Sequence, residues 1–237
     1  MILRPQPGPQ EAFLSSPADI AIFGGGAGGG KSYALLMEAL RHTGNAGFGA
    51  VVFRRTSPQI TNEGALWDEA TRMFSPLGAV ANQGDLYFSF PSGATVGFSH
   101  LQHETTKLNF QGSQIPLIGF DELTHFTASQ FWYLMSRNRS MCGVRPYVRA
   151  TCNPDADSWV AELVSWWIDQ DTGLPIPSRA GRLRWFVRIS DTLVWADTPA
   201  GLPEQRTPDG QTVPPKSLTF IPALLTDNLA LMAADPG

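Results

Sequence analysis

The stretch Gly25-Gly26-Ala27-Gly28-Gly29-Gly30-Lys31-Ser32 fits the pattern G-x-x-x-x-G-K-[S/T], the Walker A motif of loops that bind phosphate groups. An apolar run, 20–23, precedes this loop, and a helix-like segment, 33–40, follows it, so strand, loop and helix occur in the order that the motif requires. Glycines allow successive backbone N–H groups to turn toward phosphate oxygens, and the start of a helix adds partial positive charge. The stretch therefore predicts a strand–loop–helix unit whose residues 25–32 bind ATP.

Two side chains of the loop are candidates for chemistry as well as binding. Lys31 is expected to reach the β- and γ-phosphates and to act in catalysis, and Ser32 is expected to offer its hydroxyl to Mg²⁺. A glycine-rich turn that matches the pattern by accident is the alternative, and the flanking strand and helix argue against it.

A second apolar run, 115–120, ends in the acidic pair Asp121-Glu122, in the manner of a Walker B strand. ATP hydrolysis needs a carboxylate for Mg²⁺ and a group that orients or deprotonates the attacking water. We expect Asp121 to bind Mg²⁺ and Glu122 to be the catalytic residue, at the carboxyl end of a strand where parallel α/β sheets bind ligands. Capping of the next helix is the alternative, since acidic residues also favour helix starts.

Apolar strand-like runs alternate with helix-like segments along the first two thirds of the chain. This alternation predicts an α/β fold with a mainly parallel central sheet flanked by helices. The expected strands are 19–23, 50–53, 115–120 and 147–151, the expected helices are 31–42, 63–74 and 128–137, and 86–98 is expected to form a β-hairpin. We expect residues 1–167 to form the core domain and residues 168–237, which are rich in turns, to form a small linker or accessory subdomain.

Composition sets limits on the class of protein. In 237 residues, 43% are hydrophobic and 11% aromatic, which excludes a disordered chain. Cys142 and Cys152 are the only cysteines, too few for a disulfide framework, and no apolar run is long enough to span a membrane. The net charge of −4 means that any contact with nucleic acid depends on local clusters of arginine.

Together with these two motifs, the segment Thr151-Cys152-Asn153-Pro154 resembles the coupling motif of tailed-bacteriophage terminase large subunits. The resemblance is to the N-terminal ATPase domain of these DNA-packaging motors and covers about residues 5–197. Further stretches that carry it are Phe53-Arg54-Arg55-Thr56, Gln111-Gly112-Ser113-Gln114, Asp121-Glu122-Leu123-Thr124-His125-Phe126 and Arg137-Asn138-Arg139-Ser140.

The resemblance implies a P-loop NTPase of the additional-strand type that hydrolyses ATP with Mg²⁺ to drive double-stranded DNA into a procapsid. It implies a homo-oligomeric ring on the portal protein, a terminase small subunit as partner, and action in the cytoplasm of a bacterial host, with no membrane. A helicase- or recombinase-like translocase, and a truncated and weakly active packaging-assembly remnant, remain the alternatives. Full-length relatives carry a C-terminal nuclease domain, which we do not expect in this chain.

The resemblance also implies roles for individual residues. Asn153 would sense the γ-phosphate, although Asn-Pro is also a common turn opener. Gln10, in Pro7-Gly8-Pro9-Gln10, resembles a glutamine that recognises adenine, although a solvent-facing glutamine is an equal alternative. The arginine that stabilises the transferring phosphoryl group stays unassigned, because Gln111-Gly112 stands where many relatives have Arg-Gly; the candidates are Arg54, Arg55, Arg137 and Arg139.

Two stretches combine several arginines with no acidic residue. One contains Arg137, Arg139, Arg145 and Arg149, and the other contains Arg179, Arg182, Arg184 and Arg188. Arginine contacts to DNA phosphates are independent of sequence, as a motor requires. The alternative for both stretches is a solvated or ion-paired surface.

Overall fold

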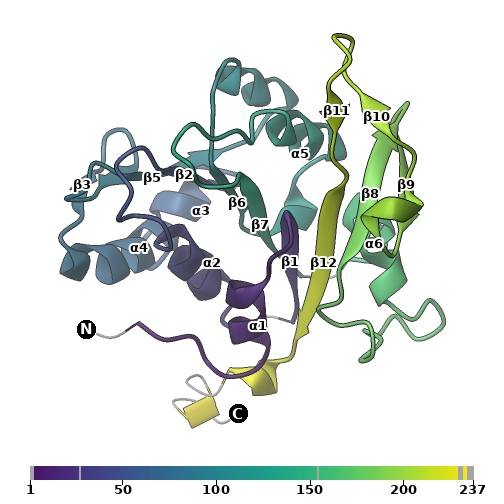
Figure 1. The fold of residues 1–237 in the computed structure, drawn as a ribbon. Coiled ribbons are helices and arrows are strands. Elements are labelled where there is room, and N and C mark those ends of the chain that lie inside the picture. Colours follow the sequence, from purple (N-terminus) through teal and green to yellow (C-terminus); the bar gives the residue numbers. More distant parts are fainter. Residues whose placement is uncertain (1–2, 27, 154, 229–231, 234–237) are drawn as a thin grey trace.

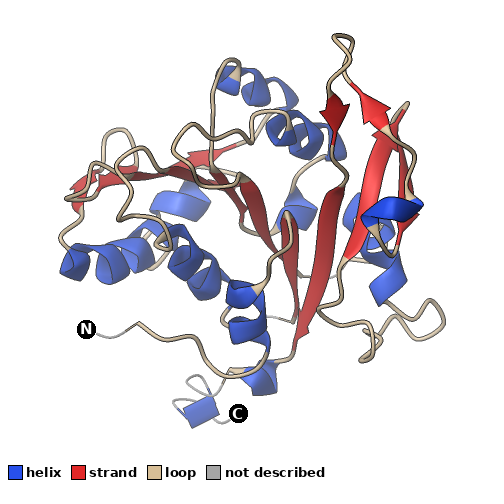
Figure 2. Ribbon diagram, in the orientation of Figure 1, coloured by secondary structure: helices blue, strands red, loops and turns tan. Residues whose placement is uncertain are grey.

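The computed structural model describes residues 3–26, 28–153, 155–228 and 232–233. Ala27 of the phosphate loop and Pro154 of the predicted coupling motif lie outside the described residues. The described chain forms a ten-stranded sheet with the strand order β3-β4-β5-β2-β6-β7-β1-β12-β8-β9 (Figures 1 and 2). A separate two-stranded ribbon consists of β10 (Gln205–Arg206) and β11 (Thr212–Val213).

The centre of the sheet is parallel and its two edges are antiparallel. Strands β5 (Thr95–His100), β2 (Gly49–Arg54), β6 (Leu117–Phe120), β7 (Tyr147–Cys152), β1 (Ile20–Gly25) and β12 (Lys216–Ala223) pair in parallel from one to the next. Antiparallel pairing adds β4 (Tyr87–Ser89) and β3 (Val80–Asn82) beyond β5, and β8 (Arg184–Ile189) and β9 (Thr192–Ala196) beyond β12. Because β7 lies between β1 and β6, the sheet has the predicted additional strand, and the predicted α/β class is confirmed.

Helices cover both faces of the sheet (Figure 2). One face carries α1 (Pro9–Ser15), α2 (Lys31–Ala39), α3 (Pro58–Thr61) and α4 (Leu66–Phe74), and the other carries α5 (Ala128–Met135) and α6 (Trp159–Val164). Alternation along β1 explains this, since Ala21 and Phe23 pack into the first hydrophobic cluster while Ile20 and Ile22 pack into the second.

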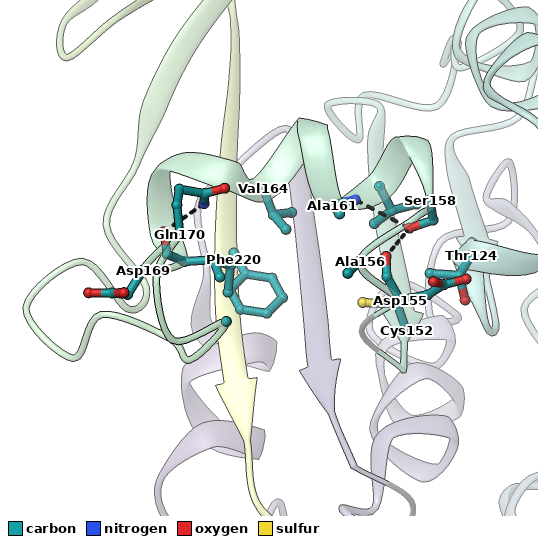
Figure 3. A pocket seen from close by; sticks show the side chains of 13 residues that line it. Thr124, Cys152, Asp155, Ala156, Ser158, Ala161, Val164, Asp169, Gln170 and Phe220 are labelled. Carbon is teal, nitrogen blue, oxygen red and sulfur yellow. Dashed lines mark hydrogen bonds between the residues drawn. The ribbon is translucent and has the colours of Figure 1, made fainter.

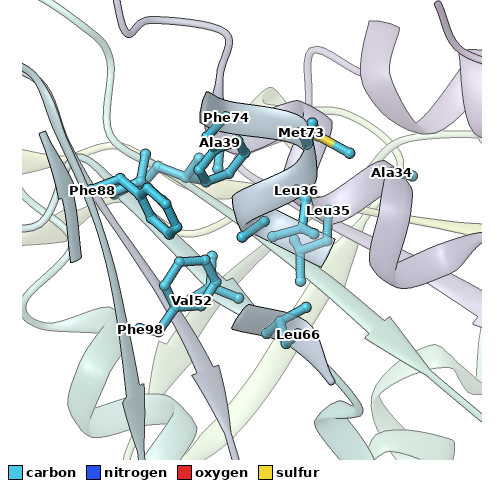
Figure 4. Packing of buried hydrophobic residues seen from close by; sticks show 14 of the residues in the cluster. Ala34, Leu35, Leu36, Ala39, Val52, Leu66, Met73, Phe74, Phe88 and Phe98 are labelled. Carbon is cyan, nitrogen blue, oxygen red and sulfur yellow. The ribbon is translucent and has the colours of Figure 1, made fainter. Parts of the chain in front are cut away.

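The first cluster holds α2 and α4 against β2, β4 and β5. Leu35 and Leu36 of α2 are buried in it together with Phe74 of α4 and Phe88 of β4 (Figure 4). Each fully buried side chain of this size contributes about 1.5–3 kcal/mol relative to an exposed one. This packing fixes the start of α2, where the phosphate loop ends.

The stretch after residue 167, expected to form a linker or accessory subdomain, contributes strands to the main sheet. Its strand β12 lies beside β1 inside the main sheet, and β8 and β9 extend the same sheet. Strand β12 could not be predicted from the sequence because Ser217 and Thr219, although polar, are buried in it. Thr219 Oγ1 donates to the carbonyl of Arg182 at 2.9 Å, and Ser217 Oγ donates to Asp19 at 2.8 Å, so both polar groups are satisfied inside the sheet.

Candidate functional site

The phosphate loop joins the end of β1 to the start of α2, and its glycines adopt backbone angles that other residues avoid. Gly28 and Gly30 have φ of 81° and 68°, in the left-handed region that glycine enters without a steric penalty. At Gly25 a side chain has no room, since a Cβ atom there would lie 1.8 Å from the carbonyl oxygen of Ala223 on β12. The loop is thus shaped by its own glycines and by the neighbouring strand.

Lys31 begins α2 and is almost fully buried, with 8% of its surface exposed. Its Nζ donates to the carbonyls of Gly25 and Gly26, which curls the side chain back over the loop. Burial lowers the pKa of Lys31 from its ordinary value, and the nearby Asp121 and Glu122 carboxylates oppose that shift. The ammonium group therefore lies inside the loop, close enough to the acidic pair for their charges to interact.

Asp121 links three elements of the site. It follows β6, its N–H donates to Phe53 O on β2 at 2.9 Å, and its carboxylate is fully buried. Oδ1 accepts from Ser32 Oγ at 2.9 Å and from Thr151 Oγ1 at 2.6 Å. The hydroxyl and the carboxylate that the sequence assigns to Mg²⁺ are therefore adjacent, and such hard oxygen donors suit this ion.

Glu122 has an unusual backbone for a residue with a side chain, with φ 63° and ψ 63°. Its N–H donates to Thr151 Oγ1 at 3.0 Å, which helps to hold this conformation. Left-handed backbone in residues other than glycine costs on the order of 1–3 kcal/mol and is enriched at active sites. The carboxylate is partly exposed and Oε2 lies 3.0 Å from His125 Nδ1.

Arg54, at the end of β2, contacts both acidic side chains. Its Nη2 lies 2.6 Å from Asp121 Oδ2, and its Nη1 lies 3.1 Å from Glu122 Oε2. Arg55 instead donates to Leu101 O and Gln130 Oε1. Arg54 is therefore the candidate arginine that the described residues place against the acidic pair. The contacts of Arg54 with the acidic pair could not be predicted, because β2 and β6 become neighbours only in the folded sheet.

A pocket of about 340 Å³ lies between the loop, Glu122 and the end of β7. It brings together residues predicted from three separate motifs, and it adds Asn228 from the chain after β12, which no sequence motif indicated. Gln10 is buried beside the loop, and its Nε2 donates to Gly30 O at 3.2 Å. The pocket lining consists of Gly28, Gly29, Gly30, Lys31, Ser32, Tyr33, Glu122, Thr151, Asn153 and Asn228.

A second pocket, of about 320 Å³, lies between α6 and β12 (Figure 3). Phe220, Val164 and Cys152 form apolar walls, and Asp155 and Asp169 also line it. Burial raises the pKa of the Cys152 thiol to about 12, so this thiol stays protonated and unreactive at neutral pH. This pocket lacks the phosphate loop and the acidic pair, so the first pocket is the candidate nucleotide site.

The two arginine stretches do not form uniform exposed surfaces. Arg149 is 4% exposed and donates to the carbonyls of Ser16, Ala18 and Val148, so its guanidinium group stabilises the fold. In the second stretch Arg188 lies over the ring of Trp132, at 4.9 Å from the ring centre. Arg179 and Arg184 lie over Trp166, at 4.8 and 5.0 Å. These cation–π contacts hold Arg188 against α5, and Arg179 and Arg184 against the 3-10 turn Ser165–Trp167 that follows α6.

Two kinds of feature are missing from the described ranges. No group of three or more His, Cys, Asp and Glu side chains there is arranged to hold a metal ion. None of the helices in those ranges combines the length and the apolarity needed to cross a bilayer.

Similarity to known proteins extends to both sequence and structure. Residues 22–237 match the family described as "Terminase large subunit, T4likevirus-type, N-terminal". No curated protein matches the chain.

The fold resembles that of phage packaging enzymes at low sequence identity. The large terminase of a thermophilic bacteriophage aligns with a TM-score of 0.59 at 16% identity, over 96% of this chain and 48% of that one. The large terminase ATPase domain of Thermus phage P74-26 aligns with a TM-score of 0.53 at 14% identity, over 95% and 83%. The N-terminal domain of the bacteriophage phi29 DNA packaging ATPase aligns with a TM-score of 0.50 at 16% identity, over 78% and 93%.

The chain thus spans about half the length of the large terminase from the thermophilic bacteriophage. These structures show that the fold is that of the phage terminase ATPase domains, and the family match extends over most of the chain. The chain therefore belongs to the T4likevirus-type terminase large-subunit family, whose N-terminal domain it contains.

Proposed function

We propose that this chain is the ATP-hydrolysing motor domain of a viral terminase large subunit, which drives double-stranded DNA into a procapsid. The observation that carries the proposal is the meeting of Lys31, Ser32, Asp121 and Glu122 around one site, with Ser32 Oγ 2.9 Å from Asp121 Oδ1. A hydroxyl, a buried carboxylate, an ammonium group and a second carboxylate are the set that phosphoryl transfer to water requires.

Each of these residues has a distinct task. The loop N–H groups and the Lys31 ammonium group bind the phosphates, and Ser32 and Asp121 would hold Mg²⁺. When bound, the ion would offset negative charge on the phosphates. Glu122, whose carboxylate borders the pocket, would orient the attacking water and accept its proton.

Asn153 and Gln10 are proposed to report on and select the nucleotide. Asn153 lies at the end of β7 and lines the pocket, where its amide can both donate to and accept from a phosphate or a water. Gln10 holds the loop at Gly30 O. Recognition of adenine by this amide stays a prediction.

The comparisons support the wider proposal. Structures of the large terminase from the thermophilic bacteriophage include complexes with ADP and with ATP-γ-S, and the bacteriophage phi29 match includes a viral genome packaging motor assembly, aligned with a TM-score of 0.50. By analogy, we propose that this chain works as a homo-oligomeric ring with the portal protein and the small subunit, in the host bacterial cytoplasm. The cation–π-anchored arginines Arg179, Arg184 and Arg188 are proposed contacts for DNA phosphates.

Phosphate release from ATP by the purified chain, measured with and without double-stranded DNA, tests the proposal directly. We expect magnesium-dependent turnover that DNA stimulates and that rising salt concentration suppresses, because phosphate contacts weaken in salt. Turnover that is unaffected by DNA would contradict the motor function while leaving the ATPase function in place. A chain that binds ATP without hydrolysing it would favour the assembly remnant.

The contact between Arg54 and Asp121 leads to a prediction about stability. Arg54→Ala leaves a fully buried carboxylate without its cation, and removal of one partner of a buried pair costs about 3 kcal/mol in free energy of unfolding. Urea denaturation measures this loss. The matched control is Arg72→Ala, which breaks the exposed pair with Glu69 on α4 and is expected to cost less than about 1 kcal/mol. Equal losses in the two variants would show that Arg54 does not stabilise Asp121.

A second prediction concerns nuclease activity. Apart from the acidic pair beside the phosphate loop, the described residues contain no group of three or more His, Cys, Asp and Glu side chains that could hold a metal ion, so we expect no cleavage of supercoiled plasmid by the purified chain with Mn²⁺. Gel electrophoresis detects nicked and linear products. Cleavage that survives repurification and disappears with EDTA would overturn this prediction.

A further inference from the structure

Hydrogen bonds among Gln6, Gln10 and Asn228, near the two ends of the described chain, form a circuit beside the phosphate loop. Asn228 Nδ2 donates to Gly28 O, and Asn228 Oδ1 accepts from Gln6 Nε2 at 2.8 Å. Gln6 N–H donates to Gln10 Oε1 at 2.7 Å, and Gln10 Nε2 donates to Gly30 O at 3.2 Å. The circuit thus begins and ends on carbonyl groups of the loop.

A hydrogen bond that holds one of these carbonyls also fixes the direction of the N–H group in the same peptide unit. In a planar trans peptide, the N–H of the following residue points away from the C=O. The bond from Asn228 to Gly28 O therefore fixes the direction of the Gly29 N–H, and the bond from Gln10 to Gly30 O fixes the Lys31 N–H in the same way. Backbone N–H groups in such a loop are the groups that bind phosphate oxygens.

The position of Asn228 is itself fixed by the fold. Strand β12 pairs with β1 up to Ala223 and Gly25, so it ends beside the start of the loop. Asp227 Oδ2 then accepts from Leu224 N–H at 2.7 Å and closes the turn Leu225–Asp227 that brings Asn228 to Gly28. Asn228 also lies on the wall of the 340 Å³ pocket.

We propose that Asn228 is a positioning residue of the nucleotide site, which holds the Gly29 N–H toward the phosphates and connects the chain after β12 to the loop. The inference rests on the proposed ATP binding at this pocket. It adds to that proposal a residue outside the sequence motifs, and it makes nucleotide affinity depend on a segment about 200 residues away in the chain.

The test compares variants of Asn228 by ADP binding in isothermal calorimetry. Asn228→Asp keeps the shape and the acceptor for Gln6 but loses the donor to Gly28 O, and Asn228→Ala removes both contacts without adding charge. We expect both variants to bind ADP about tenfold more weakly, since a lost hydrogen bond in such a site changes affinity by about this factor. Asn62→Asp, which makes the same substitution at an exposed position outside the pocket lining, is the control and is expected to bind like the wild type.

Positioning and folding are separated by melting curves. We expect the melting temperature without nucleotide to stay unchanged in both Asn228 variants, while the rise caused by ADP becomes smaller. If the wild type binds ADP and both Asn228 variants bind it equally well, this inference is wrong and the proposed function stands. The inference is also wrong if Asn62→Asp weakens ADP binding as much as the Asn228 variants do. It is likewise wrong if the Asn228 variants melt at a clearly lower temperature than the wild type without nucleotide, since the weaker binding would then follow from a less stable fold. A wild-type chain that binds no ADP would overturn the proposed function and this inference with it.

Discussion

Glu122→Gln should leave ATP binding intact and lower the rate of phosphate release by about 10²- to 10⁴-fold, the range that positioned general acid–base groups contribute. Glutamine has the same shape but cannot take a proton from water. Its amide oxygen can still accept from Arg54, whose Nη1 lies 3.1 Å from the present carboxylate. The backbone bond from residue 122 N–H to Thr151 does not involve the side chain. The substitution therefore removes the proposed base and little else.

Single-turnover phosphate release, together with calorimetric titration of a non-hydrolysable ATP analogue, separates chemistry from binding. The control is Glu162→Gln, which changes an exposed glutamate on α6 that does not line the nucleotide pocket. Hydrolysis at the wild-type rate in Glu122→Gln would refute the catalytic role of Glu122. A joint loss of binding and hydrolysis would instead assign Glu122 to nucleotide binding.

Lys31→Met should weaken the binding of ADP and ATP by about 100-fold, because a hydrogen bond from a charged donor contributes about 1.5–3 kcal/mol. Methionine keeps most of the buried aliphatic stem and removes the ammonium group. Lys31 is nearly fully buried and its charge already carries a desolvation penalty, which is the cause of its lowered pKa. Its Nζ donates to the carbonyls of Gly25 and Gly26, so the ammonium group lies at the loop where phosphates are proposed to bind.

The same calorimetric titration measures this loss, and melting curves without nucleotide check the fold. Lys107→Met is the control, since Lys107 pairs with Glu104 and contacts Ser129, outside the pocket lining. We expect ADP to bind this control as tightly as the wild type. Unchanged affinity in Lys31→Met would mean that the loop at 25–32 does not bind phosphate through its lysine.

Much of the central sheet could be predicted because its strands are apolar on both faces. The runs at 19–23, 50–53, 115–120 and 147–151 correspond to β1, β2, β6 and β7 within two residues at each end. The predicted helices at 31–42, 63–74 and 128–137 contain α2, α4 and α5, which end earlier or start later than expected. A strand that packs against the core on both faces is a continuous run of apolar residues, and such a run can be recognised from the sequence alone.

Strand β12 left no such pattern. Buried Ser217 and Thr219 interrupt its apolar residues, and Pro222 lies near its end. These residues are tolerated because Asp19, the carbonyl of Arg182 and the neighbouring strands satisfy their polar groups. None of those partners is near in sequence, so no local pattern indicated this strand.

The phosphate loop, the acidic pair and the strand–helix alternation could be recognised from the sequence, because each depends on residue types at short fixed spacings. Tertiary structure alone decided which distant groups meet. Ser32 and Asp121 are 89 residues apart in the chain, and Arg54 reaches both carboxylates only because β2 and β6 are neighbours. Asn228 reaches Gly28 only because β12 pairs with β1. Such contacts are set by strand order and burial of the whole sheet, which no local spacing of residues encodes.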